Sequence, residues 1–443
     1  MRRMAAGIGL AAALWLVVPG AAMAAVDYST APFTETTNSY AYGQAPVFLP
    51  DGKTVLFGKD FQTGEKNQIY SASYPSGSDV TCLTCTGPDD TTNNINGVPA
   101  VRPQGDWVLF SSWRGREITF GSPGYGGIGS ALWVMHPNGT DQTQITETQA
   151  QFLEGNTTTT DPSAFGSDEG YDDYHAYWSP NGQEIEWAHF DGNIPTGGVG
   201  KWDIEVGHFV VNDGVPSLTD IHVVRPANGH WYETQWWAPN GSGFLYTETT
   251  DGADIPHLFF CHLIDDDSAC DVTQLTDDAS WDEQALFTPD MKDVIFMSSR
   301  SQPGLFNTWA QTAQTLGLPN DYDWLLILPL FEAGYLQPVG AESTDLYELD
   351  LATGSVRRLT SDGNDGWVTP EFTWDPTNHF LMWTENRIAN GYRYQFPPTV
   401  AGWSAQLEAL AGSPYVPSTD LGSNGIGFAS IPVQQRTEIG VFK

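Results

Sequence analysis

The sequence predicts an all-β protein, a β-propeller of six blades with a seventh blade as the open alternative. Three observations support this fold class. A strand–turn–strand pattern recurs six times, an apolar strand follows each turn, and a second pair of strands often ends in Leu-Thr. A unit of about four short strands cannot bury its own faces, so such units must stack against one another. Radial closure of the stacked units gives a propeller.

The repeated turn consists of proline, a polar residue and, in most copies, glycine, which suits a tight turn between antiparallel strands. The turn prolines are Pro50, Pro103, Pro180, Pro239, Pro289 and Pro376. The apolar strands behind them cover 55–57, 108–110, 185–187, 244–246, 294–296 and 380–382. We therefore expect blades that start near residues 44, 97, 174, 233, 283 and 369, in one propeller domain that covers 25–443.

Two gaps between successive turn prolines, Pro103 to Pro180 and Pro289 to Pro376, are longer than the others and indicate insertions. We expect insertions at 115–129, 148–173 and 301–342. Long loops on a rigid scaffold often carry binding sites. The tail 388–443 either holds a seventh blade or supplies the last strands of the sixth blade.

The first 24 residues have the features of a secretory signal peptide. Arg2 and Arg3 form its charged start, an apolar run covers 8–18, and Ala22-Met23-Ala24 fits a small-residue cleavage site. A membrane anchor is the alternative, but this run is too short to span a bilayer and no later stretch is long enough. We expect cleavage after Ala24 and a mature protein in the periplasm or outside the cell.

The charge of the chain excludes several kinds of partner. There are 54 acidic and 18 basic residues, a formal net charge of −36. A surface of this sign repels nucleic acids and anionic membranes, so neither is an expected partner. The chain also has 17 Trp, 17 Tyr and 22 Phe, and stacking on sugars is one use for such rings. The expected partner is a carbohydrate or another protein, and the expected state is a monomer.

The four cysteines fall into two local groups, Cys82 with Cys85 and Cys261 with Cys270. Oxidising compartments favour disulfides over free thiols. Cys82-Leu83-Thr84-Cys85 has the spacing of redox and metal motifs, but no second CxxC and no βαβ context accompany it. We therefore expect structural disulfides, and all three pairings of four cysteines stay open.

The Pro-Asp-Gly turns, the apolar strands behind them and the Leu-Thr endings resemble the TolB-like (PD40) propeller family over about Gln44–Arg387. The resemblance implies the fold but not one activity, because the family includes binding scaffolds, protease domains and polysaccharide lyases. It also implies that the turns lie on one face of the propeller and the expected insertions on the other. Residues that precede the inner strands should ring the axis on that second face.

These ring residues are acidic and aromatic in blades three to five, carry one acid in blade six, and are uncharged in blades one and two. A hard cation such as Ca²⁺, which takes six to eight oxygen ligands, or another divalent cation is one expected occupant. The expected metal ligands are Asp172, Asp173, Asp282 and Glu283. The expected ligand-binding residues are Tyr174, Trp231, Glu233, Gln235, Trp281, Gln284, Arg114 and Glu371.

Two functions remain open from the sequence. The first is an exported propeller that binds a carbohydrate, a cation or a protein partner on its acidic, aromatic face. The alternative is a polysaccharide lyase that cleaves a uronic-acid glycan by β-elimination. That reaction needs a neutralised carboxylate, a base for the C5 proton and an acid for the leaving oxygen.

Placement similar to that in propeller lyases of the oligogalacturonate and ulvan types implies catalytic roles for His175, His189, Tyr232 and Arg300. Glu248 stands where the ulvan type would have its arginine, so Arg300, one blade on, is the candidate. Arg114 occupies the position after its own strand that Arg300 occupies in blade five. For either arginine, an ion pair with a neighbouring carboxylate that locks blades together is the structural alternative.

Overall fold

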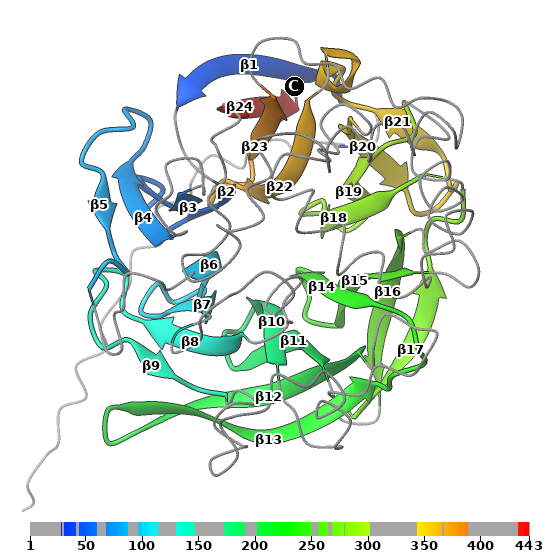
Figure 1. Ribbon diagram of the computed structural model, residues 1–443. Helices are drawn as coiled ribbons and strands as arrows, with labels where there is room; N and C mark the ends of the chain where they lie inside the picture. Colours follow the sequence, from blue (N-terminus) through cyan, green and yellow to red (C-terminus); the bar gives the residue numbers. More distant parts are fainter. Residues whose placement is uncertain are drawn as a thin grey trace, which may run out of the picture.

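The computed structural model describes residues 28, 31–40, 44–59, 68–86, 96–112, 114, 130–146, 172–190, 202–249, 256–264, 268–278, 280–301, 343–365, 367–388 and 433–442. These residues form six four-stranded antiparallel sheets arranged as blades around a central axis (Figure 1). The prediction of an all-β propeller is confirmed. The segments predicted as the signal peptide and most of the expected insertions lie outside the described residues.

Blades one to three follow one another along the chain, each with its strands in sequence order from the axis outward. Blade one contains β2 (Gln44–Phe48), β3 (Thr54–Lys59), β4 (Gln68–Ser73) and β5 (Thr81–Cys82). Blade two contains β6 (Asn96–Val101), β7 (Val108–Ser112), β8 (Ala131–Met135) and β9 (Thr143–Gln144). Blade three contains β10 (Asp172–Trp178), β11 (Glu184–Phe190), β12 (Trp202–Asn212) and β13 (Val215–Arg225).

Blades four and five repeat this order. Blade four contains β14 (Tyr232–Trp237), β15 (Gly243–Thr249), β16 (Pro256–Ile264) and β17 (Ala269–Gln274). Blade five contains β18 (Asp282–Phe287), β19 (Asp293–Ser298), β20 (Asp345–Asp350) and β21 (Val356–Arg358), followed by the 3₁₀ turn η3 (Asp362–Asp365). Within the described ranges no helix is long and apolar enough to cross a membrane.

Blade six is built from both ends of the chain. Its strands are β22 (Val368–Trp374), β23 (Phe380–Ile388), β24 (Val433–Phe442) and β1 (Phe33–Tyr40). The C-terminal β24 pairs with β23, and the N-terminal β1 covers the outer edge of β24, as the neighbouring blue and red strands of Figure 1 show. Within the described residues, the tail therefore supplies a strand of the sixth blade.

The Pro-Asp-Gly turns have one backbone geometry. In blade three the amide of Gly182 donates to the carbonyl of Ser179 (2.8 Å), and Gly182 has a φ of 68°. Glycine adopts this left-handed conformation without strain. In blades five and six, Met291 and Asn378 take the glycine position, both with a φ of 59°, so the turn persists where glycine is missing.

The Leu-Thr endings tie the outer strand of a blade to its third strand. The hydroxyl of Thr84 accepts from the amide of Ile69 (2.9 Å), and that of Thr276 accepts from the amide of Leu258 (3.1 Å). Thr146 and Thr360 make the same bond to Leu132 and Leu346. An unpaired buried amide would be costly, so a hydroxyl at this position recurs for a structural reason.

The hydrophobic core lies between neighbouring blades. Tryptophans at the ends of inner strands fasten one blade to the next: Trp178 donates to the carbonyl of Ala100 (3.2 Å) and Trp374 to that of Phe287 (2.9 Å). Trp236 packs against three separate core clusters, which places its ring near the axis. The axis is therefore partly filled by side chains from the inner strands.

Both local cysteine groups are disulfides. Cys82 is bonded to Cys85, and Cys261 is bonded to Cys270. The second bridge joins the adjacent strands β16 and β17 of blade four. The pairing that the sequence left open is thus the local one, and the chain has no free cysteine.

Candidate functional site

The inner strands of all six blades are interrupted at the same level by a β-bulge. The register shifts lie between Gln44 and Val47, Gly97 and Ala100, Tyr174 and Tyr177, Thr234 and Trp237, Glu283 and Ala285, and Val368 and Glu371. A bulge re-aims the side chain of its extra residue. Ala45, Val98, His175 and Gln284 have a positive φ at this level, which is uncommon outside glycine. Blades one and two place small apolar residues there, whereas blades three and five place polar ones.

Six polar side chains from four inner strands meet around the axis, and we call them the axial cluster. They are His175, Glu233, Gln235, Glu283, Gln284 and Glu371. Nδ1 of His175 donates to the carbonyl of Thr234 (2.8 Å) and lies 3.6 Å from Oε1 of Glu233. Its Nε2 lies 3.7 Å from Oε1 of Glu371. The imidazole of blade three is therefore held between carboxylates of blades four and six.

Glu233 and Glu283 form an acid pair inside the axial cluster. Oε1 of Glu233 accepts from the amides of Gln235 (3.1 Å) and Gln284 (2.9 Å), and Oε2 of Glu283 accepts from Trp281 (2.5 Å). Burial raises the pKa of Glu233 well above its usual value, with a further contribution from the charge of Glu283. Burial also raises the pKa of Glu283. The interaction between the two carboxyl groups raises the pKa of Glu233 further and opposes the rise in the pKa of Glu283.

Aromatic rings border the axial cluster. The rings of Tyr177 and Trp236 lie 5.0 Å apart. In their strands these residues follow His175 and Gln235, so they lie nearer to the Pro-Asp-Gly turns. The ring of Tyr174 lies 4.9 Å from that of His175. Tyr177 is buried, and burial raises its pKa well above the usual value, so its hydroxyl stays neutral. Tyr174, Trp236 and Trp281 are half-buried.

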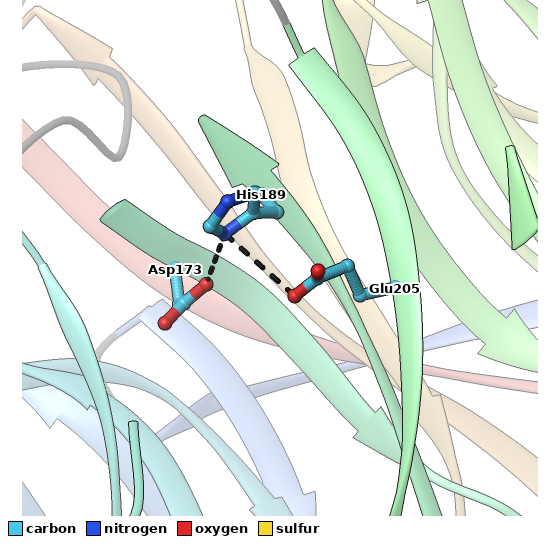
Figure 2. A group of neighbouring side chains, drawn as sticks. All are labelled: Asp173, His189 and Glu205. Atoms are coloured by element: carbon cyan, nitrogen blue, oxygen red, sulfur yellow. Dashed lines mark hydrogen bonds and ion pairs between the residues drawn. The ribbon is translucent and has the colours of Figure 1, made fainter. Parts of the chain in front are cut away.

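A second group of side chains lies within blade three, and we call Asp173, His189 and Glu205 the blade-three triad. They come from the adjacent strands β10, β11 and β12 and point toward one another (Figure 2). Nδ1 of His189 lies 2.8 Å from Oδ1 of Asp173 and 3.7 Å from Oε2 of Glu205. One ligand atom from each residue lies within 4.8 Å of the other two. Among the described residues this is the one group of acids and histidines with such spacing.

The strand register explains why the triad forms. Asp173 pairs with His189 across β10 and β11, and His189 pairs with Asp203 across β11 and β12. Directly paired residues share a face of the sheet, and so does Glu205, two residues beyond Asp203. Burial alone would lower the pKa of His189, but its hydrogen bond to Asp173 and the charges of Glu205 and Asp203 raise it to about 10. The ring is thus protonated unless a metal ion replaces the proton.

Both candidate arginines donate hydrogen bonds to neighbouring side chains. Arg300 makes a bidentate ion pair with Asp282, at 2.9 and 3.0 Å, and contacts Asp278 at 3.1 Å. Burial raises the pKa of Asp282 to about 6, against the opposing effect of the guanidinium. Arg114 donates to Gln142 and to Asn96 (3.2 Å) and lies over the ring of Trp133. Arg300 is therefore paired with neighbouring carboxylates, as the structural alternative expects, although Asp282 belongs to the same blade.

Tyr232 lies in a third set of contacts, at the start of blade four. It is buried, and its hydroxyl donates to the carbonyl of Pro226 (3.3 Å). Glu248, directly opposite Tyr232 in β15, accepts from Arg225 (2.9 Å) and from His230 (2.8 Å). Burial would raise the pKa of Glu248, but the bonds from His230 and Arg225 lower it. Trp231 is half-buried beside this set.

The predicted site residues therefore divide among several places. Four of the expected ligand-binding residues meet in the axial cluster: Glu233, Gln235, Gln284 and Glu371. His175, expected to be catalytic, and Glu283, expected to bind metal, join them there. Asp173 and His189 meet in blade three, and Asp282 meets Arg300. Asp172 begins β10, and its side chain lies outside the described part. In the described contacts His175, His189, Tyr232 and Arg300 share no common partner, so the lyase hypothesis stays a prediction.

Sequence reasoning missed two residues. Glu205 lies on the third strand of blade three, and its signal was the alternation Trp202-Asp-Ile-Glu-Val, which puts Asp203 and Glu205 on one face. Glu186 is fully buried in β11 and accepts from the indole of Trp237. Burial raises the pKa of Glu186 well above its usual value. No local pattern marks a glutamate that is buried between blades.

The sequence matches no family model and no curated protein sequence. Among solved structures the chain is similar to a TolB-like protein from Agrobacterium tumefaciens, with 14% identity and a TM-score of 0.40, over 72% of this chain and 80% of that one. It is also similar to an oligogalacturonate lyase in complex with manganese, with 11% identity and a TM-score of 0.41, over 93% and 91% of the two chains.

A third similar structure is prolyl oligopeptidase B from Galerina marginata, with 11% identity and a TM-score of 0.39. The match covers 77% of this chain and 38% of that one. Such likenesses concern the fold alone, and the propeller architecture itself rests on the six sheets.

Proposed function

We propose that this protein is an exported binding propeller that holds one divalent metal ion in the blade-three triad and binds a carbohydrate or protein ligand on its acidic, aromatic face. The triad carries the proposal, because three adjacent strands bring one nitrogen and two oxygen ligands together within a blade. Two carboxylates beside one imidazole are costly in a buried site unless a cation compensates their charge. The two disulfides support export, since such bonds persist in oxidising compartments.

The donor set favours a transition-metal ion over Ca²⁺. Ca²⁺ prefers six to eight oxygen ligands, whereas imidazole combined with carboxylates suits Zn²⁺ and Mn²⁺. Ligands at about 2.1 Å from a tetrahedral ion lie about 3.4 Å apart. The distances of 2.8 and 3.7 Å from Nδ1 of His189 bracket that value, so small side-chain shifts suffice.

Metal analysis tests the proposal directly. The protein is purified without chelator, its metal content is measured by mass spectrometry, and Zn²⁺, Mn²⁺ and Ca²⁺ are titrated calorimetrically into protein stripped with EDTA. We expect one site per chain that prefers Zn²⁺ or Mn²⁺. Metal at a hundred times its dissociation constant should stabilise the fold by about 2.7 kcal/mol.

Matched histidine variants locate the site. His189→Ala removes the central ligand and should weaken metal binding by at least about 100-fold, because even outer partners of metal ligands contribute 10- to 100-fold. His208→Ala changes a half-exposed histidine of the same blade and should bind metal like the wild type. Equal metal binding by both variants would refute a site in blade three.

A further inference from the structure

The axial cluster has chemistry that the blade-three triad does not explain. Three carboxylates, those of Glu233, Glu283 and Glu371, face one imidazole at the meeting point of four blades. The cluster is held by the inner strands of these four blades. Five of its members are less than a tenth exposed, whereas the side chain of Glu371 keeps 16% exposure and gives the cluster contact with solvent.

The axial cluster contains two buried hydrogen-bond acceptors for which the structure shows no donor. Gln235 is fully buried, and its amide nitrogen is used on Glu233, whereas its Oε1 has no hydrogen-bond partner. Oε2 of Glu371 is likewise buried without a partner. The side-chain amide nitrogen of Gln284 also donates a hydrogen bond to Glu233. Buried polar atoms are rarely left unpaired, so each of these two acceptors of the axial cluster indicates a missing donor.

The charge of the site selects the kind of donor. A neutral hydroxyl would satisfy an acceptor but leave the excess of carboxylates uncompensated, whereas a cation does both. A single metal ion fits less well, because among the described residues the three glutamates and His175 do not form a group with ligand atoms within 4.8 Å of one another. The half-buried rings of Trp236 and Trp281 beside the cluster favour an organic cation, which aromatic faces attract.

We propose that the axial cluster binds the protonated amine of a small ligand, with Glu371 and the Oε1 atom of Gln235 accepting its hydrogen bonds. The amine lies against the half-buried aromatic rings and near the Glu233–Glu283 pair. The site disfavours a uronate, because it would bring another carboxylate to three existing ones. The net charge of −36 attracts such a ligand from solution at low ionic strength. This inference goes beyond the metal site and does not require it.

Two ligands that differ in the charge of one group test the proposal. An oligomer of glucosamine and the same oligomer with every amine acetylated are titrated into the protein by calorimetry, at low salt and at a pH where the free amines are protonated. Putrescine serves as an amine without a sugar. We expect binding of the glucosamine oligomer, of putrescine, or of both, and none of the acetylated oligomer. Putrescine alone would identify a polyamine rather than an amino sugar as the source of the amine.

Two variants then test whether the amine binds at the axial cluster. Glu371→Gln keeps the shape of the side chain and should weaken amine binding about tenfold or more, the usual effect of losing a charged hydrogen bond. Asp213→Asn removes one charge at an exposed turn, where asparagine tolerates the φ of 52°, and should leave binding unchanged. Thermal melting checks that both variants are folded.

Three results would overturn the proposal: equal binding of free and acetylated oligomers, no binding of any of the amines, or wild-type binding by folded Glu371→Gln. If Glu371→Gln does not fold, the comparison of the free with the acetylated oligomer is sufficient to test the proposal. Repeating the titrations after EDTA treatment separates this site from the blade-three triad. Amine binding that survives in His189→Ala shows that the two sites are independent, so failure of one proposal is distinguishable from failure of the other.

Discussion

The closure of blade six can be weakened at one side chain. Phe442 ends β24, is 4% exposed, and packs edge-on against Tyr28 (5.3 Å between ring centres) and Phe33 (4.9 Å). Replacing a buried phenylalanine by alanine costs about 3–5 kcal/mol. Each aromatic pair adds about 0.5–1.5 kcal/mol beyond burial. Phe442→Ala should therefore lower the free energy of unfolding by at least about 4 kcal/mol.

Urea unfolding measures this cost, and hydrogen exchange shows where it acts. We expect the amides of β1 to lose protection in Phe442→Ala, because this ring joins the N-terminal segment to the last strand. Phe209→Ala is the matched control: Phe209 is 6% exposed and packs edge-on against Trp178 in blade three. It should cost a similar free energy without exposing β1. Equal exchange of β1 in both variants would refute the idea that the aromatic cluster closes the ring.

Three further predictions concern buried polar groups. Because burial raises the folded-state pKa of Glu186, its stabilising contribution is complete below the unfolded pKa and falls as pH rises toward the folded one. Glu186→Gln should therefore lose less stability than the wild type between about pH 5 and 9 in urea unfolding, and parallel curves would contradict this. Arg300→Met leaves the carboxylate of Asp282 buried without its cation and should cost about 3–5 kcal/mol, part of which Asp282→Asn should restore in the double variant. Thr276→Val leaves the buried amide of Leu258 without an acceptor and should cost about 1–3 kcal/mol, measured against Thr353→Val at an exposed turn.

The fold was predictable because its signals are local and repeated. A Pro-Asp-Gly turn specifies the turn by itself, and six copies specify the ring. The Leu-Thr ending was visible as a pattern, although its cause, a hydroxyl that caps a buried amide, needed the structure. The sequence offered the tail as a source of the last strands of blade six, but the contribution of β1 was not predictable, because its pairing with β24 joins segments about 400 residues apart without a shared motif.

The candidate sites were predictable in residue type but not in grouping. Asp173 and His189 border one hairpin, but the sequence analysis gave them separate roles, as a metal ligand and as a catalytic residue. Glu205 was missed because it comes from a third strand, after a segment whose length hides the register. Once the pairing of His189 with Asp203 is known, the period-two geometry of the strand assigns Glu205 to the same face.

The β-bulge explains why the sequence named the members of the axial cluster without predicting which of them contact one another. A regular strand would put Glu233 and Gln235 on one face and would point alternate residues toward the axis. The bulge between Thr234 and Trp237 breaks that alternation, so Gln235 and its neighbour Trp236 both lie near the axis. In blade three the same bulge gives His175 a φ of 54° and holds its ring between two glutamates. A bulge leaves no mark in residue periodicity, yet it decides which side chains meet, so the chemistry at the axis follows from backbone geometry as much as from residue type.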